Sequence, residues 1–456
     1  MKRSLQIEYK MIEQQYIDLF EQYRHDVDAH SVPGMNKERD AAFETFKKIG
    51  FPTSKQEDYK HSNVARAFDA DLGLNLRNVP FSVNPYDAFK CDVPNLSTNL
   101  YFLLNDRYYD TVEQHHALPE GVFVGSMQEF SKKYPQVFEA HYARIADSSD
   151  NGLVAYNTLF AQDGFVVYVP KNTSVEKPLQ LIQILRGQAD TNVNRRLLII
   201  AEENTQVKLL VCDHAVDAAR FVVTQVTEIF AEASAQVDLY ELEDNSEQVT
   251  RLSSLFSAQK DQSNVIVTNI ALHNGYTRNN YRFRLLGEHA EAHVGGLALC
   301  DKQQHVDNFA FLDHAVPNCM SNELFKYILQ EQSTGVFCGK ILVEKDAQKT
   351  QAYQTNRNLC ASPDARMYSK PELEIYADDV KCSHGLTTGQ LDLDALFYLR
   401  ARGIGEDEAR LMLMEAFTRD VVEMIRIDSL RERLESLISK RFRGQLVRCG
   451  NCNVCK

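Results

Sequence analysis

The sequence predicts a mainly β protein with flanking α-helical regions. Helix-forming residues dominate both ends of the chain, short β-branched runs fill the middle, and a loose repeat recurs among those runs. From these observations we expect an α-rich domain over residues 1–150 and a β core over residues 151–388. A helical domain over residues 389–440 and a basic, cysteine-rich tail over residues 441–456 would follow.

The first region has the residue spacing of amphipathic helices. Apolar residues between Tyr9 and Tyr23 lie close to a helical stripe, and Ala41 to Ile49 continues in a similar style. Gly50 and Pro52 then interrupt the pattern. Further prolines at positions 80, 85 and 94 predict that the second half of this domain is rich in loops.

The middle region reads as a series of strands. Its β-branched runs are separated by Asn, Asp and Gly, and no convincing helix of ten or more residues interrupts residues 160–380. The clearest runs are Phe165–Val169, Leu197–Ile200, Phe221–Val223 and Val265–Val267.

A recurring phrase runs through these strands. Glu203–Leu209 is echoed by Ala233–Leu239, and looser copies follow at Glu288–Val294 and Ser333–Phe337. Each copy has a polar turn, a small residue and alternating apolar positions. Because one such unit cannot bury its inner face alone, the repeat favours stacked β units that share one core. The repeat alone leaves a β-sandwich as an equally good interpretation.

The C-terminal region returns to helical spacing. Leu391–Arg402 and a segment from Glu406 to about Lys440 read as helices, with Gly403 in the position of a C-terminal cap. The tail then carries three thiols in a CxxCxxC arrangement, which is metal-ligand spacing. We expect these cysteines to act as an accessory site for soft metal or sulfur, with basic neighbours that favour the thiolate. They are Cys449, Cys452 and Cys455.

Composition excludes several classes of function. The 456 residues carry a net charge of −13, which argues against nucleic acid as the main partner. No signal peptide or 18-residue apolar run is present, so we expect a cytoplasmic protein with reduced cysteines. Gly335–Ile341 is one residue short of a phosphate-binding loop and lacks its hydroxyl residue. We therefore expect a protein that is not an enzyme.

Residues 371–404 are similar to the signature block of the SufB/SufD family of iron–sulfur cluster assembly scaffolds. They read PELEIYADDVKCSHGLTTGQLDLDALFYLRARGI, and Cys382-Ser383-His384 stands where the SufB branch has Glu-His-Glu, so the SufD branch is the more similar one. Shorter matches extend the resemblance over about residues 50–425, at Pro52–His61, Asp163–Pro170, Ala347–Thr350 and Gln354–Leu359.

The resemblance implies a fold and a set of partners. The fold would be a right-handed parallel β-helix core between N-terminal and C-terminal helical regions. The resemblance therefore favours stacked β units over a β-sandwich. The partners would be a SufB-like subunit and a SufC ATPase, with a homodimer in isolation. The cargo would be transient iron or an iron–sulfur cluster shared with SufB, and a flavin is also compatible. The SufC interface would use the C-terminal helices, with Leu396, Phe397, Arg400, Arg402 and Phe417 as candidates.

Cys382 and His384 are the candidate cluster-assembly residues. They are two residues apart, so on a strand they would face the same side. A thiolate and an imidazole form a ligand pair suited to iron or a cluster. From spacing alone the favoured interpretation is structural, with Cys382 as a small buried residue and His384 bonded to nearby backbone. The family resemblance implies a role in cluster assembly for His384 and leaves Cys382 open.

Other cysteines and other functions remain as alternatives. Cys300, Cys319, Cys338 and Cys360 lie in the strand-rich core, where we expect them to be structural. A β-helix enzyme acting on polysaccharide would need convergent carboxylates, and in the signature block only Asp378 and Asp379 form an acidic pair. A homodimeric iron store is a third possibility, distinguished by needing no ATPase.

Overall fold

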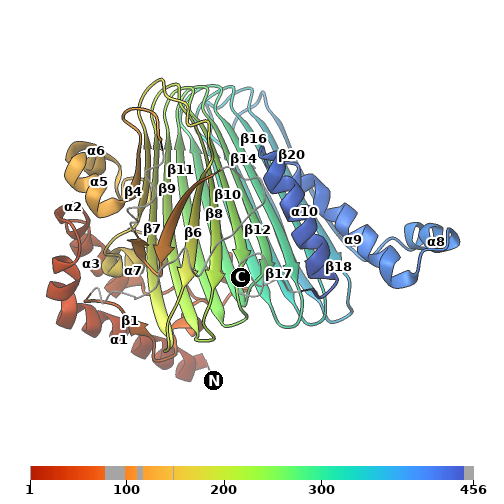
Figure 1. The fold of residues 1–456 in the computed structure, drawn as a ribbon, viewed down its shortest axis with the longest axis horizontal. Coiled ribbons are helices and arrows are strands. Elements are labelled where there is room, and N and C mark those ends of the chain that lie inside the picture. The colour runs from red at the N-terminus through yellow and green to blue at the C-terminus, as the bar shows by residue number, and fades with distance from the viewer. Residues whose placement is uncertain (1, 78–97, 110–116, 147, 446–456) are drawn as a thin grey trace.

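The computed structural model describes residues 2–77, 98–109, 117–146 and 148–445. Two parallel sheets face each other, and consecutive strands alternate between them, so that the chain coils into a flattened solenoid of about eight turns (Figure 1). This confirms the predicted parallel β-helix with helices on both sides. The sandwich alternative is wrong, because the ladders between successive turns are parallel, and antiparallel pairing is confined to the short strand pairs β2–β3 and β4–β5 at the N-terminal end.

We call the two layers sheet A and sheet B. Sheet A contains β4 (Phe123–Ser126), β5 (Phe165–Val169), β7 (Thr191–Ala201), β9 (Phe221–Ala231), β11 (Val249–Gln259), β13 (Tyr276–Leu285), β15 (His305–His314), β17 (Thr334–Val343) and β19 (Arg366–Ile375), with β1 (Gly73–Leu74) paired to β7. Sheet B contains β3 (Arg107–Tyr109), β2 (Asn99–Leu104), β6 (Leu179–Leu185), β8 (Gln206–Ala215), β10 (Gln236–Asp244), β12 (Asn264–His273), β14 (Glu291–Cys300), β16 (Met320–Leu329), β18 (Gln351–Cys360) and β20 (Lys381–Gly389).

The repeated phrase of the sequence marks one column of turns between the sheets. In each turn a residue takes a positive φ, between 56° and 61° at Asn204, Ser234, Gln262 and His289. The next residue is small and buried. In successive turns this position is occupied by Thr205, Ala235, Ser263, Ala290 and Cys319. The repeat is weak because its period varies. Ile199, Ile229 and Ser257 are paired in register, yet they are 30 and 28 residues apart (229 − 199 and 257 − 229).

The N-terminal end of the solenoid is covered by helices. They are α1 (Lys2–Ala29), α2 (Pro33–Asn36), α3 (Arg39–Ile49), α5 (Met127–Lys133), α6 (Pro135–His141) and α7 (Gly152–Phe160). Every residue of α7 is buried, and a Cβ at Gly152 would clash with the Gly50 carbonyl oxygen at 1.7 Å. The buried Arg39 donates to the carbonyls of Thr158 and Ala161, both at 2.8 Å, and thereby satisfies the C-terminal end of α7.

Three helices follow the last strand: α8 (Leu393–Ala401), α9 (Glu406–Val422) and α10 (Asp428–Phe442). Helices α9 and α10 cover the outer face of sheet B, whereas α8 projects beyond it (Figure 1). Buried residues of α9, α10 and the turn between them join Leu297, Leu299 and Ile328 of the strands in one apolar cluster, and they are Met414, Val421, Val422, Ile425, Ile427, Leu430, Leu434 and Ile438. Lys326 of β16 is buried beneath α9, where its Nζ donates to the Phe417 carbonyl (2.8 Å) and pairs with Asp420 (2.6 Å).

The single helix expected from Glu406 to Lys440 is wrong, because α9 and α10 are separate helices. The chain turns between them to bury both Ile425 and Ile427 against sheet B, and the Arg426 N–H donates to the Tyr240 hydroxyl at 2.9 Å. Neither Gly nor Pro lies in this turn, so local sequence carries no breaker signal. None of the helices within the described ranges is long and apolar enough to span a membrane.

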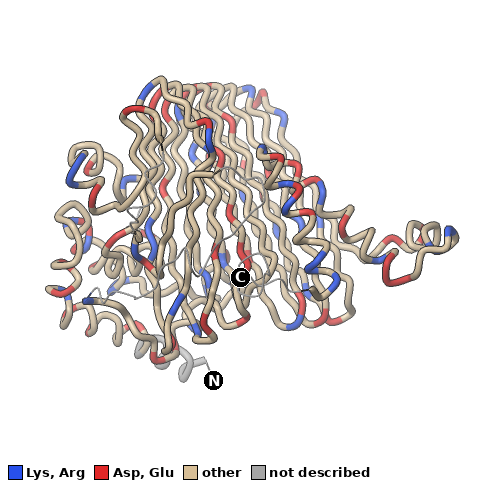
Figure 2. The backbone as a smooth tube through the Cα atoms, viewed as in Figure 1, with Lys and Arg blue, Asp and Glu red and all other residues tan. Residues whose placement is uncertain are grey.

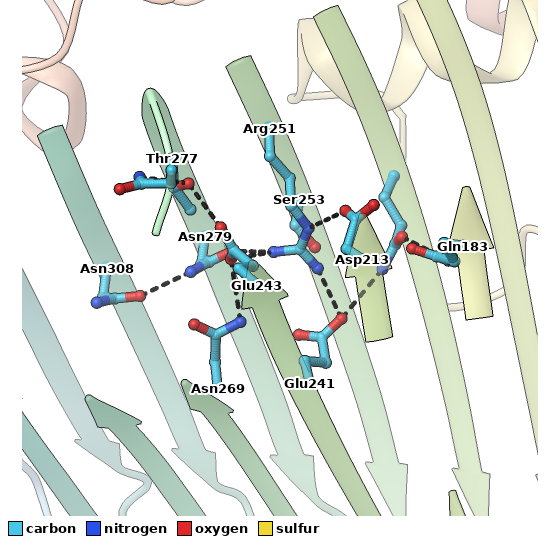
Figure 3. Close-up of polar contacts among 12 residues, drawn as sticks. Gln183, Asp213, Glu241, Glu243, Arg251, Ser253, Asn269, Thr277, Asn279 and Asn308 are labelled. Carbon is cyan, nitrogen blue, oxygen red and sulfur yellow. Dashed lines mark hydrogen bonds and ion pairs between the residues drawn. The ribbon is translucent and has the colours of Figure 1, made fainter. Parts of the chain in front are cut away.

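The interior between the sheets contains a row of hydrogen-bonded polar side chains, which we call the polar lane (Figure 3). At its centre the guanidinium of Arg251 pairs with Glu241 (2.7 Å) and Glu243 (2.9 Å) and donates to Asn279 (2.7 Å). Burial alone would lower the pKa of Arg251, but the adjacent carboxylates raise it above its ordinary value. Hydrogen bonds extend the lane in both directions, through Gln225, Gln183 and Arg195 on one side and through Asn308 and Tyr327 on the other.

Charges outside the interior are mixed in sign. Figure 2 shows acidic and basic residues interspersed along the turns and helices, while most of the strand length carries neither. In this view, acidic residues are therefore not gathered over one part of the molecule.

Candidate functional site

The two ends of the solenoid differ in what covers them. Helices pack over the first turns, whereas β19 and β20 form the last turn and no element of the described ranges pairs with their outer edges. Pro371 lies within β19, which suits an edge strand because proline cannot donate to a ladder. Large apolar side chains are exposed here, including Tyr376 at 58% and Leu386 at 42%. This open turn carries the predicted site.

Cys382 and His384 lie on the same face of β20, as their spacing predicts. Their register partners on β18 are Ala352 and Gln354, both buried on the inner face of sheet B. His384 is exposed at the open end. Cys382 is half-buried and packs against the interior, and burial raises the pKa of its thiol. The free chain therefore holds an accessible imidazole beside a thiol that is predominantly protonated at neutral pH.

The inner column that ends at His384 changes character along the solenoid. In register order it runs through Leu209, Leu239, Val267, Val294, Glu323, Gln354 and His384. Four apolar residues are thus followed by three polar ones, all in the last three turns. The Gln354 Nε2 donates to the Glu323 Oε2 at 3.0 Å.

Glu323 is a fully buried carboxyl group whose only hydrogen-bond partner among the described residues is the Gln354 amide. Burial raises its pKa from 4.5 to about 8, because Gln354 offsets only part of the desolvation. At neutral pH the group is therefore mainly the uncharged acid. The sequence interpretation did not single out Glu323, and it quoted Gln354 without a role. Aligning the repeats would have revealed them, since each replaces an apolar residue of the preceding turns.

The remaining core cysteines do not join this site. Cys300, Cys319 and Cys338 are buried and Cys360 is half-buried, and burial raises the pKa of each thiol. Cys319 occupies the small-residue position after a turn, where its thiol donates to the Gly287 carbonyl at 3.2 Å. Within the described ranges, no three His, Cys, Asp or Glu side chains are grouped so that they could hold a metal ion.

The candidate ATPase-binding residues divide into buried and exposed sets. Leu396 is buried. The Phe417 ring is partly covered by Lys326, whose Nζ lies 4.7 Å from the centroid of that ring. Phe397, by contrast, is 74% exposed on α8, which projects away from the solenoid (Figure 1). Arg400 pairs with Glu406 at 3.2 Å, and Arg402 stacks on the Tyr398 ring at 3.5 Å.

The three cysteines of the tail lie outside the described residues. Cys449, Cys452 and Cys455 therefore stay a prediction. Two of the basic residues expected to act on them are already paired with carboxylates. Arg441 binds Asp301 at 2.7 Å and Arg443 binds Glu408 at 2.7 Å.

Comparison with known proteins gives consistent matches along the chain. Residues 184–417 match the family described as "SUF system FeS cluster assembly, SufBD core domain", and residues 10–181 match "SufBD protein N-terminal region". The chain is 32% identical to the iron–sulfur cluster assembly protein SufD of Escherichia coli over 405 residues, 87% of this chain and 90% of that protein. It is 33% identical to a SufBD family protein of Synechocystis over 294 residues, 62% of this chain and 65% of the relative. A SufBD family protein of Pyrococcus horikoshii is 24% identical over 310 residues, 68% of this chain and 69% of that protein.

Proposed function

Because the chain belongs to the SufBD family of iron–sulfur cluster assembly proteins, we propose that it is a non-catalytic scaffold subunit that pairs with a SufB-like protein and binds a SufC-like ATPase. The observation that carries this proposal is the open last turn. It combines unpaired strand edges with an exposed imidazole and a half-buried thiol on one inner face.

The edges of β19 and β20 suit a β-rich partner. Unpaired backbone N–H and C=O groups of an edge strand can continue into a second sheet, and the exposed Tyr376 and Leu386 offer apolar contact area beside them. We expect a SufB-like subunit, as a member of the same family, to present the same kind of solenoid edge. Pairing there would place its own residues against His384 and Cys382.

The chemistry of the pair fits iron or a nascent cluster as cargo. A neutral imidazole donates a lone pair to iron, and the Cys382 thiol becomes a ligand on losing its proton, which metal binding favours. One imidazole and one thiolate leave most positions of an iron or cluster unfilled. Ligands from a partner would complete the site while the complex is closed and would free the product when it opens.

Helix α8 is the proposed ATPase-binding element. Leu393 (71%), Phe397 (74%) and Tyr398 (54%) are all largely exposed on this short helix, which is unusual for apolar side chains of this size. Deleting residues 391–456 would be a poor test, because α9 and α10 cover an apolar face of sheet B. Point substitutions on α8 avoid that damage.

The test is co-purification of the chain with the SufB-like and SufC-like proteins of the same cell. Phe397→Ser should lose the ATPase and retain the SufB-like subunit, whereas Leu386→Glu should do the reverse. Each variant is the matched control of the other, since both change one exposed apolar residue. If both variants retain both partners, the assigned surfaces are wrong; if the unaltered chain captures neither protein, the proposed scaffold role is wrong.

A further inference from the structure

We propose that Gln354 and Glu323 are positioning residues for His384: the Gln354 amide accepts a hydrogen bond from the His384 ring, and the buried Glu323 holds that amide in place. The proposal rests on the proposed function, in which His384 binds the iron of a nascent cluster. It adds a buried layer behind the exposed ligand.

The ladder places the three side chains in line. Glu323 pairs with Gln354, and Gln354 pairs with His384, with no shift of register in either ladder. Register partners in neighbouring parallel strands point to the same side and lie about 4.8 Å apart. The three side chains therefore form one stack that begins in the core and ends at the open face.

The Gln354 side chain has one hydrogen-bonding group to spare. Its Nε2 is committed to Glu323, but its buried Oε1 has no partner in the described structure. An unpaired buried amide oxygen costs free energy unless it acquires a donor. Glu323 is the neighbour of Gln354 on one side of the column, and the neighbour on the other side is His384, whose ring can supply an N–H.

The opposite sheet leaves room for this amide. A Cβ at Gly339 of β17 would lie 2.2 Å from the Gln354 Nε2. Glycine at this position therefore lets the Gln354 side chain lie across the interior. Any larger residue would push the amide away from its place in the column.

Glu323 supplies the fixed end of the stack. It accepts the hydrogen bond from the Gln354 Nε2, and within the described residues no basic side chain pairs with it. In the four preceding turns the same column is filled by Leu and Val. Burying a carboxyl group at this position costs more free energy than burying Leu or Val. We infer that Glu323 is used here because it anchors the Gln354 amide.

The stack would determine what His384 presents to iron. If the Gln354 Oε1 accepts one ring N–H, the other ring nitrogen keeps its lone pair and faces the open end. Partners of this kind fix the tautomer and orientation of a ligating histidine, and removing them typically costs about 10–100-fold in metal affinity or activity.

The first experiment measures the ring itself in the full-length chain. The chain is labelled with ¹⁵N-histidine, the His384 signals are assigned by their loss in His384→Gln, and the tautomer ratio is read from the two ring-nitrogen shifts. One tautomer should predominate in the unaltered chain. Gln354→Leu and Glu323→Leu should shift the ratio to that of a free histidine, whereas Glu323→Gln should retain the original ratio. An unchanged ratio in Gln354→Leu would overturn the proposal.

The second experiment measures cluster formation by the purified complex, as iron and sulfide bound under anaerobic conditions. Gln354→Leu should reduce it about ten-fold or more. Gln183→Leu, which removes another buried interior amide far along the solenoid, controls for lost stability and should retain cluster formation. Equal losses in Gln354→Leu and Gln183→Leu would overturn the positioning role. If His384→Ala abolishes cluster formation while Gln354→Leu changes neither readout, the positioning role fails and the proposed function stands. Normal cluster formation in His384→Ala would instead count against the proposed function.

Discussion

The buried polar groups around Arg251 and those around Glu323 differ in how they are hydrogen-bonded. Around Arg251 several strands contribute charged and amide groups that bond mainly to one another (Figure 3), although Arg195 Nη2 has no hydrogen-bond partner within the described residues. All of these groups are buried, so we call this set the closed network. Around Glu323 the chain of hydrogen bonds runs in one direction and stops at an unpaired amide oxygen below the open end.

This difference distinguishes buried polar groups that stabilise the fold from buried polar groups that can still bind a ligand or partner. In the Arg251 network, two guanidiniums face three carboxyls, those of Asp213, Glu241 and Glu243, with every group deep in the interior. Burial raises the pKa of Glu243, which eases the excess of negative charge. Such a network holds neighbouring turns in register but offers nothing to a ligand. The shorter stack at the open end can still gain an interaction.

Breaking the closed network should have the largest effect on stability. Arg251→Ala leaves Glu241 and Glu243 buried without their cation, so we expect the free energy of unfolding to fall by about 3–5 kcal/mol. Urea denaturation of the purified chain measures this loss. Arg284→Ala is the matched control, because Arg284 lies on β13 and pairs with Asp313 at 3.0 Å but is mostly exposed. That control should cost about 0–1 kcal/mol, and similar losses in both variants would contradict the comparison.

The Glu323 stack should show itself as a pH dependence of stability. The pKa of Glu323 is about 8 in the folded chain, whereas the ordinary value of 4.5 applies to the unfolded chain. Between these two pH values the folded state therefore binds more protons than the unfolded state. The stabilisation is complete below pH 4.5 and is lost as pH rises toward 8 and above.

Glu323→Gln removes this dependence. Relative to that variant, the unaltered chain should lose about 1–3 kcal/mol of unfolding free energy between pH 6 and pH 8. Urea midpoints of both proteins across this range provide the measurement, and background titrations common to the two cancel in the difference. Parallel curves would show that the carboxyl is not protonated in the core.

The open end should respond strongly in function and little in stability. His384 is exposed, and its side chain would lose the proposed hydrogen bond to Gln354, so His384→Ala should lower the free energy of unfolding by about 0.5–1.5 kcal/mol. Cluster formation by its complex should nevertheless be lost. A larger fall in the free energy of unfolding would indicate that His384 is part of the folded core.

The cysteine tail should have the smallest effect on the fold. Replacing Cys449, Cys452 and Cys455 by Ser should leave unfolding unchanged and reduce the metal bound by the chain, because three thiols at this spacing can bind one soft metal ion. Metal analysis and growth under iron limitation test this prediction. Equal metal content and equal growth in the variant would refute an accessory role.

The sequence was most informative where a local pattern matched a local structure. The strands at Phe165–Val169 and Val265–Val267, the end of α3 at Gly50, and the shared face of Cys382 and His384 all follow from spacing and residue type. The choice between a parallel β-helix and a sandwich needed the family resemblance, since it depends on which strands pair across turns of unequal length.

Tertiary contacts decided what the pattern could not. The turn between α9 and α10 forms because Ile425 and Ile427 both find apolar contacts on sheet B, and no residue in that turn disfavours a helix strongly. Glu323 likewise looks unremarkable in a strand until its register with Val294 and Gln354 is known. Both depend on neighbours that are distant in sequence.

The one-sided environment of the last turn has a dynamic consequence. Each turn of a solenoid is held by the turns next to it, so a terminal turn has half the usual support and frays first. Amide hydrogen exchange should therefore be fastest on β19 and β20 and slow progressively toward β12, while the helix-covered first turns stay protected. Solenoids usually end in a capping element, and within the described residues helices cover only the N-terminal end of this one. A docked partner would act as the missing cap, so that the strand carrying His384 becomes rigid only when the assembly forms.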